Sequence, residues 1–140
     1  MRKCSFTVVG EPRGKGRPRF TKNNRPYTPK ETVEYEKQIA RCFQQQCPRV
    51  FFPEGEPIDL RITAYYQIPK SYSKKKKQAM RDRQIRPRTK PDADNIYKAV
   101  ADACNKVAYY DDSQIVDAQV RKFYSDEPRL VITIQEAKCF

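Results

Sequence analysis

The sequence PIDLRITAYYQI, at residues 57–68, alternates between apolar and polar side chains more cleanly than any other stretch of the chain. Alternation with a period of two predicts a strand that is buried on one face only. The face expected toward the core carries Ile58, Leu60, Ile62, Ala64 and Tyr66. The opposite face carries Asp59, Arg61, Thr63, Tyr65 and Gln67. This stretch is the best strand candidate in the chain.

Weaker patterns on both sides of this stretch predict three further strands. Residues 3–9, 115–124 and 130–134 are rich in β-forming side chains. Only a short turn at residues 126–128 separates the last two of these strands, so we expect them to pair as a hairpin.

Three helices are also expected. The first has Thr28 as N-cap, Pro29 at its first position and Glu31 at its third, and runs to about residue 46. Its apolar face comprises Val33, Ile39, Ala40 and Phe43, with Tyr35 and Cys42 at the margin. A short exposed helix covers residues 71–82, and another covers residues 95–106. These elements predict a single α+β domain over residues 1–140, with helices packed on a mixed or largely antiparallel sheet.

The charge balance of the chain points to a polyanionic partner. Lysine and arginine total 29 against 17 acidic residues, a formal net charge of +12, and nucleic acid is the usual partner of such a chain. The alternative is a basic surface that is merely solvated. No stretch approaches the roughly 18 apolar residues of a membrane span. No apolar signal region follows Met1, so the expected location is the cytoplasm.

Cysteine and histidine usage narrows the chemistry. The five cysteines are odd in number and form no Cys-x-x-Cys pair, which is typical of free thiols in a reducing compartment. The chain has no histidine. Serine–histidine and cysteine–histidine hydrolases, histidine-based nucleases and mixed Cys/His zinc sites are therefore excluded. Catalysis must use carboxylates, lysines, tyrosines or bound water.

Carboxylates cluster in the sequence KPDADNIYK, at residues 90–98, although the protein is basic. Pro91 favours an extended conformation in the residue before it. If Asp92 is extended as well, Asp92 and Asp94 point to the same side, and Asp94 is expected to cap the helix that follows. Such a pair suits Mg²⁺, and Asp112 could supply a third oxygen ligand. The alternative is a solvated Asp92 beside a simple helix cap.

Two basic segments accompany these acids. The loop at residues 10–27 holds three of the four glycines, lacks the Gly-Lys-Ser/Thr of a P-loop, and carries Phe20 and Tyr27 for stacking on bases. We expect a flexible loop, with a surface hairpin as the alternative. From Lys74 to Lys90 the chain has nine basic residues and then reaches Asp92. The residues expected to contact DNA are Lys15, Arg17, Arg19, Lys74, Lys75, Lys76, Lys77, Arg86, Arg88 and Lys90.

Taken together, these motifs resemble those of a known family. KPDADNIYK, followed by YDDSQIVD at residues 110–117, looks like the central motifs of the RusA family of Holliday junction resolvases. The sequence GKGRPRF, at residues 14–20, resembles the corresponding loop in one branch of that family, and YTPK at residues 27–30 fits its helix entry. The resemblance extends in order from about residue 4 to residue 135.

The resemblance implies a specific activity. RusA family members are small homodimeric endonucleases of recombination and repair, often encoded by prophages. They bind four-way DNA junctions and use Mg²⁺, or Mn²⁺ in its place, to nick two opposed strands. By motif position the catalytic residues are Asp92, Asp94, Asp112 and Lys98, of which the three aspartates bind the metal.

Asp111 and the basic run before Asp92 fit the family pattern less closely than the other motifs. Asp111 is adjacent to the third acid, but the second aspartate of the pair fits the family pattern better. Some members carry an unbroken run of arginines before the first catalytic aspartate, and here Thr89 and Pro91 interrupt that run. For Lys98 the structural alternative is an ion pair with Asp94, four residues earlier on the same helix, which contributes only roughly 0.2–0.5 kcal/mol.

Three other functions compete with the nuclease. A non-catalytic protein that binds branched or single-stranded DNA explains the basic charge, but it leaves the acidic cluster without a purpose. A nucleotidyltransferase also uses Asp-x-Asp and a later aspartate, but it usually carries an upstream Gly-Ser, which is absent here. A purely structural protein leaves the motif match unexplained.

Overall fold

Strand β4 (Ile58–Gln67) is an inner strand of a four-stranded sheet with the order β1-β6-β4-β5. The computed structural model describes residues 2–16 and 18–138. The other strands of this sheet are β1 (Lys3–Val9), β5 (Ile115–Ser125) and β6 (Arg129–Glu136). Strand β6 is antiparallel to β1 and β4, whereas β5 is parallel to β4. The sheet is therefore mixed and mostly antiparallel, which confirms the predicted α+β class.

The predicted hairpin between the last two strands is wrong. Strand β4 lies between β5 and β6, and it pairs with both of them along most of its length. The inner face of β4 is almost fully buried. A strand in that position needs backbone partners on both sides, because buried N–H and C=O groups are costly when unpaired. A short turn alone did not determine which strands pair.

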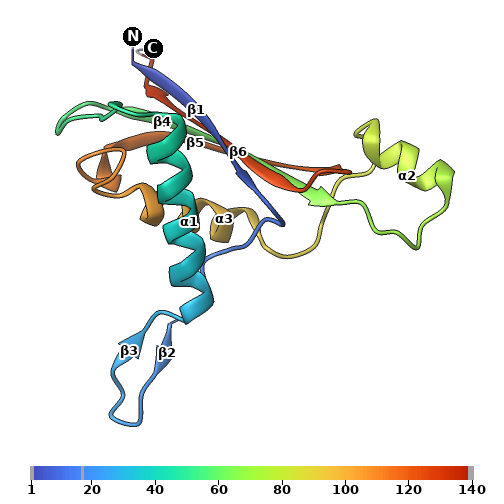
Figure 1. Ribbon diagram of the computed structural model, residues 1–140, viewed down its shortest axis with the longest axis horizontal. Coiled ribbons are helices and arrows are strands. Elements are labelled where there is room, and N and C mark those ends of the chain that lie inside the picture. Colours follow the sequence, from blue (N-terminus) through green and yellow to red (C-terminus); the bar gives the residue numbers. More distant parts are fainter. Residues whose placement is uncertain (1, 17, 139–140) are drawn as a thin grey trace.

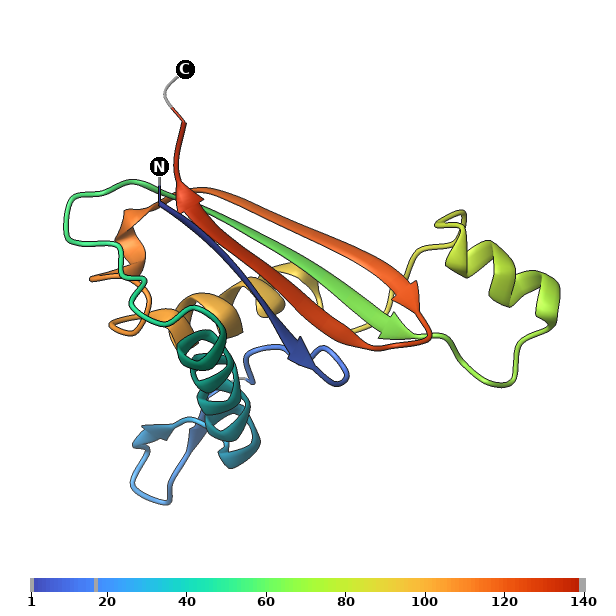
Figure 2. The ribbon, with the colours of Figure 1, turned by 45° about the horizontal axis from the view of Figure 1, so that its top comes forward.

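Both long helices cover the same face of the sheet, as Figures 1 and 2 show. They are α1 (Lys30–Gln46) and α3 (Ala93–Cys104), and they also contact each other. The five predicted core residues of β4 lie beneath them and are at most 5% exposed. The predicted inner face of β4 is therefore confirmed, and one hydrophobic core unites the described residues. The predicted outer face is only partly confirmed, because Arg61 is exposed but Asp59 is buried, where its carboxylate accepts hydrogen bonds from Arg61 and Gln135.

Helix α1 begins one residue later than predicted, and helix α3 begins two residues earlier. Helix α1 starts at Lys30 with Pro29 as N-cap and no side-chain cap, so the expected capping by Thr28 is wrong. Its buried positions are Thr32, Tyr35, Ile39 and Phe43, whereas Val33 and Ala40 are only partly buried. Thr32 is buried because its hydroxyl oxygen accepts a hydrogen bond from the Gly16 N–H at 3.1 Å.

In α3 the N-cap is Asp92 rather than Asp94. The backbone of Asp92 is extended, as the predicted pairing with Asp94 supposed, but the helix starts directly after it, so Asp94 lies in the first turn. On the face of α3 that packs on the sheet, Ile96, Val100 and Ala103 are buried, while Val107 beyond the end of the helix packs partly buried against the same core.

Two small elements project from this body (Figure 1). Strands β2 (Arg19–Phe20) and β3 (Pro26–Tyr27) form the surface hairpin that was the alternative for the basic loop. Helix α2 (Lys74–Arg81) extends from the far end of β4 and buries only Met80. Within residues 2–16 and 18–138, no helix combines the length and apolar character that crossing a bilayer requires. Cys4, Cys42, Cys47 and Cys104 are free thiols, and Cys139 lies outside the described residues.

Candidate active site

The segment that leads into Asp92 is fastened to the sheet by three hydrogen bonds. The Tyr66 hydroxyl on β4 donates to the Pro91 carbonyl at 2.6 Å. The Lys122 Nζ on β5 donates to the Thr89 carbonyl at 2.7 Å. The Arg86 Nε donates to the Lys122 carbonyl at 3.0 Å. Asp92 therefore emerges from a held segment rather than from a free loop.

The glycine-rich loop packs against the start of α3. The Lys15 N–H donates to the Asn95 carbonyl at 3.0 Å. A Cβ atom on Gly14 would lie 2.8 Å from the Cβ of Asn95, so only glycine permits this approach. On the other side, the bond from Gly16 to Thr32 ties the loop to α1. The expectation of a flexible loop is thus wrong for residues 14–16.

These two segments enclose a cleft of about 650 Å³. It is lined by the loop from Pro12 to Lys15, by residues 90–92 and by Asn95. One carboxylate, Asp92, shares the cleft with the basic side chains of Arg13, Lys15 and Lys90. Cations of this kind attract a polyanion, while the carboxylate attracts a hard cation, so the cleft can hold a phosphate next to a metal ion.

Lys15 is already paired inside the protein. Its ammonium group forms ion pairs with Glu36 of α1 and, at 3.1 Å, with Asp102 of α3. Burial lowers the pKa of Lys15, but the bonds to the two carboxylates outweigh burial and leave this pKa above its ordinary value. Lys15 is therefore placed to join α1 to α3, and its predicted contact with DNA stays a prediction. Arg17 lies outside the described residues, and Arg19 is exposed on β2.

The three aspartates expected to bind metal all lie on or beside α3. Asp92 and Asp94 are exposed at the start of the helix. Asp112 is half-buried in the short 3₁₀ helix η1 (Asp112–Gln114), which contacts α3. Burial raises the pKa of Tyr97 on α3, and the charge of Asp112 raises it further.

The two-residue spacing does not align Asp92 and Asp94 in the expected way. Asp92 is extended but Asp94 is helical, so the period of two that holds along an extended chain does not relate their side chains. Among residues 2–16 and 18–138, no three carboxylate or thiol groups come together as a metal-ligand cluster. Mg²⁺ usually takes only one or two carboxylates, so the oxygen donors of Asp92 and Asp94 still suit it. The set of metal ligands stays a prediction.

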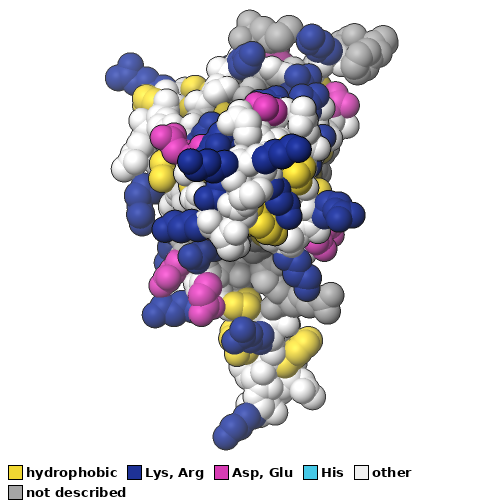
Figure 3. Space-filling view, turned by 90° about the vertical axis from the view of Figure 1, so that its right-hand side faces the viewer, with side chains coloured by type: hydrophobic (Ala, Val, Ile, Leu, Met, Phe, Trp, Pro, Cys, Tyr) yellow, Lys and Arg dark blue, Asp and Glu magenta, His cyan; other side chains and the backbone are white. Residues whose placement is uncertain are grey.

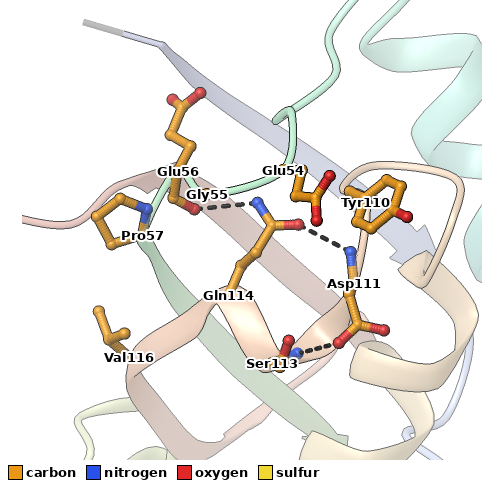
Figure 4. Close-up of a pocket in the computed structure, with 9 residues that line it drawn as sticks. All are labelled: Glu54, Gly55, Glu56, Pro57, Tyr110, Asp111, Ser113, Gln114 and Val116. Carbon is orange, nitrogen blue, oxygen red and sulfur yellow. Dashed lines mark hydrogen bonds between the residues drawn. The ribbon is translucent and has the colours of Figure 1, made fainter.

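The two adjacent aspartates after α3 differ in their hydrogen bonds, and Figure 4 shows those of the first one, Asp111. The Asp111 carboxylate accepts a bond from the Ser113 N–H at 3.0 Å and lies 3.4 Å from the Lys106 Nζ. Its own N–H donates to the Gln114 side chain at 2.8 Å, which completes a capping box. The hydrogen bonds from Ser113, and then the ammonium group of Lys106, hold the pKa of the Asp111 carboxyl below its ordinary value. The carboxylate of Asp112 has no hydrogen bond or ion pair within the described part of the chain, so it remains available as a ligand.

Lys98 is exposed on α3, one turn after Asp94. Its alternative role as the partner of Asp94 is not realised, because no ion pair within 4.0 Å joins them in the described structure. The ammonium group is therefore free to meet an anion at the start of α3.

The basic run before Asp92 divides into two parts. Lys74, Lys75, Lys76 and Lys77 lie on α2, while Arg86, Arg88 and Lys90 lie exposed on the segment that returns along β5. Sequence reasoning missed Tyr66 and Lys122, because nothing in a strand pattern indicates a hydrogen bond to a distant loop. Arg13 could have been found, since it belongs to the basic loop already singled out.

Comparison with known proteins agrees with the order of these motifs. The family described as "Endodeoxyribonuclease RusA" matches residues 9–135. The uncharacterized protein YqaN of Bacillus subtilis (strain 168) is 40% identical over 136 residues, which cover 94% of each chain. A protein of Lactococcus phage r1t named "Crossover junction endodeoxyribonuclease rusA" is 34% identical over 90 residues, or 64% of this chain and 62% of its own. With a family match that spans nearly all of the described residues, this chain belongs to the RusA endodeoxyribonuclease family.

Proposed function

We propose that the protein resolves four-way DNA junctions by paired, metal-dependent hydrolysis of phosphodiester bonds during recombination and repair. The observation that carries this proposal is the cleft in which Asp92 meets Arg13 and Lys90, because one wall can hold a phosphate and the other a metal ion. Membership of the RusA family supports a nuclease. The name of the phage relative supports a crossover junction as the substrate.

Each residue of the site has a distinct part in the proposal. Arg13 and Lys90 bind the DNA backbone, which sets position without reading sequence. Lys98 neutralises the negative charge that develops on the phosphate. Asp92 and Asp94 at the start of α3, with Asp112 on the neighbouring η1, would supply the oxygen ligands for Mg²⁺, or Mn²⁺ in its place; the three do not form one cluster in the described structure, and Mg²⁺ needs only one or two of them directly. When bound, the metal supplies an activated water and a Lewis acid, chemistry that needs no histidine.

A homodimer completes the proposal. Two cuts on opposed strands require two sites, and a closed two-fold dimer presents them by symmetry. The competing function is a protein that binds branched DNA without cutting it. It is disfavoured because exposed carboxylates beside a phosphate site weaken DNA binding unless a cation lies between them.

The test uses an end-labelled mobile four-way junction, with linear duplex of the same sequence beside it, with and without Mg²⁺. The wild type should cut the junction in symmetric pairs only when the metal is present. Asp92→Asn should bind the junction normally and cut at least about 100-fold more slowly, since it removes a first ligand. Glu127→Gln is the matched control, because it removes an exposed carboxylate at the β5–β6 turn and should leave cutting unchanged. Tight binding without cutting in any divalent metal would overturn the proposal.

A further inference from the structure

A separate cleft lies at the end of the molecule where α2 projects. Its volume is about 490 Å³. Figure 3 views the molecule from this end, where lysine and arginine side chains crowd around hydrophobic ones. The cleft is lined chiefly by Tyr72, Lys76, Met80, Arg86, Arg88 and Tyr124. None of the residues that line it is acidic.

Tyr72 presents an aromatic face at the rim of this cleft. It lies directly before Ser73, the N-cap of α2, and its side chain is 38% exposed. The Ser73 hydroxyl oxygen accepts from the Lys76 N–H at 3.2 Å, which fixes the first turn of the helix. The Lys76 Nζ lies 3.7 Å from the centroid of the Tyr72 ring, so a cation occupies one face of the ring. A flat ring has a second face that can stack.

Tyr124 supplies a second ring from β5. It is partly buried against the core, which makes it a rigid wall. Burial raises the pKa of Tyr124, Tyr72 raises it further, and Arg88 lowers it. All three side chains line this cleft.

The arginine next to this wall is also held in place. The Arg86 guanidinium lies 4.4 Å from the ring centroid of Phe123, and its Nε donates to the Lys122 carbonyl. The ring contact and this one hydrogen bond leave the other N–H groups of the guanidinium available to a ligand. Fixed cations without neighbouring acids favour a phosphate ligand.

The position of the cleft relative to Asp92 is also informative. Thr89 lines the cleft and precedes Asp92 by three positions. An extended chain covers at most about 3.6 Å per residue, so the two Cα atoms are at most about 11 Å apart. One strand of DNA advances about 3.4 Å per nucleotide. A strand with its phosphate at Asp92 therefore reaches this cleft within about three nucleotides.

We propose that this cleft binds an unpaired nucleobase of the DNA strand that is cut, stacked on Tyr72 and Tyr124. Lys76, Arg86 and Arg88 hold the phosphates that flank this base. Aromatic stacking tolerates any base, because every base has a flat face. The inference rests on the proposed function, since continuous base stacking is interrupted at the strand exchange point of a junction, where a protein can unpair a base at the lowest cost. It assigns α2 a role in holding unpaired DNA.

A binding titration without metal tests the site independently of cleavage. The probe is a fluorescein-labelled oligothymidylate of twelve nucleotides in EDTA, and anisotropy reports its affinity. Tyr72→Ala should weaken binding about fivefold or more, whereas Tyr72→Phe should stay within about twofold of the wild type, since stacking needs the ring alone. Phe51→Ala removes an aromatic side chain that is 42% exposed in the loop before β4, and it should have no effect.

Two outcomes would overturn the proposal. If Tyr72→Ala binds the oligonucleotide as tightly as the wild type, the cleft does not stack a base. If Tyr72→Phe is as weak as Tyr72→Ala, the hydroxyl rather than the ring is responsible. Circular dichroism of each variant is the control that checks whether the variant is folded. Failure of junction cleavage with the Tyr72→Ala effect intact would refute the resolvase function and leave this site standing.

Discussion

Replacing Tyr66 with phenylalanine removes a single hydroxyl and tests what holds Asp92 in place. The ring is 5% exposed, and the hydroxyl donates to the Pro91 carbonyl at 2.6 Å. Burial raises the pKa of Tyr66 above its ordinary value, and neighbouring Asp92 raises it further. The hydroxyl therefore stays protonated and remains a donor throughout the working pH range. Tyr66→Phe keeps the packing and loses only this bond.

The expected loss of stability follows from that one bond. A hydrogen bond of this kind contributes about 0.5–1.5 kcal/mol. The entropy of unfolding is roughly 2.1 cal/mol/K per residue, or about 0.3 kcal/mol/K for a chain of this length. The midpoint of thermal unfolding should thus fall by about 2–5 °C. Because Asp92 follows Pro91 directly, we also expect junction cleavage to slow about tenfold through a misplaced carboxylate.

Tyr109→Phe is a matched control for this variant. The Tyr109 hydroxyl also donates to a backbone carbonyl at 2.6 Å, that of Ala101 in the last turns of α3. It should lose a similar amount of stability, by scanning calorimetry, while it cleaves at the wild-type rate. Equal slowing of the two variants would show that lost stability, rather than the position of Asp92, limits the rate. Unchanged cleavage by Tyr66→Phe would refute the reasoning directly.

Three further predictions concern the parts of the fold that hold the site. Lys15→Met should lower the free energy of unfolding in urea by about 1–2 kcal/mol, because it leaves two carboxylates unpaired; unchanged stability with weaker DNA binding would instead make Lys15 a DNA contact. Gly14→Ala should cost about 1–3 kcal/mol in thermal unfolding, since the new methyl group meets Asn95; wild-type stability would contradict this packing. The pKa of Asp111 is lowered in the folded protein, so its contribution to stability is complete above about pH 4 and fades as the pH falls through the lower, folded-state pKa. Asp111→Asn should accordingly lose stability at pH 6 and much less at pH 3, and equal losses at both pH values would refute the role of this ionised cap.

The sequence predicted those features that depend on local patterns. The alternation in β4 identified its buried face, because burial on one side imposes a period of two, but it did not show that Asp59 on the other face is buried as well. The helix starts were displaced because Pro29 and Asp92 take the N-cap positions themselves. The pairing of β5 with β4 was missed, since a parallel partner far away in sequence leaves no local signal.

The candidate site shows the same division. The motifs identified Asp92, Asp94, Asp112 and Lys98 by position, and their assigned roles stay predictions. Asp111 forms a capping box and Asp112 does not. Two identical residues side by side in a sequence give no indication of this difference, because it depends on hydrogen-bond geometry. Likewise, the sequence gives no sign that Lys15 forms ion pairs with Glu36 and Asp102, because only the fold brings these distant residues together.

Treatment of a supercoiled plasmid that extrudes a cruciform tests the central claim most directly, because the form of the product counts the cuts. Paired cuts across the four-way junction convert the plasmid to a linear molecule, whereas a single cut gives only an open circle. With Mg²⁺ the wild type should yield linear plasmid, and Asp92→Asn should leave the plasmid supercoiled. Open circles alone, or linear product from Asp92→Asn, would contradict a paired junction cleavage that depends on this carboxylate.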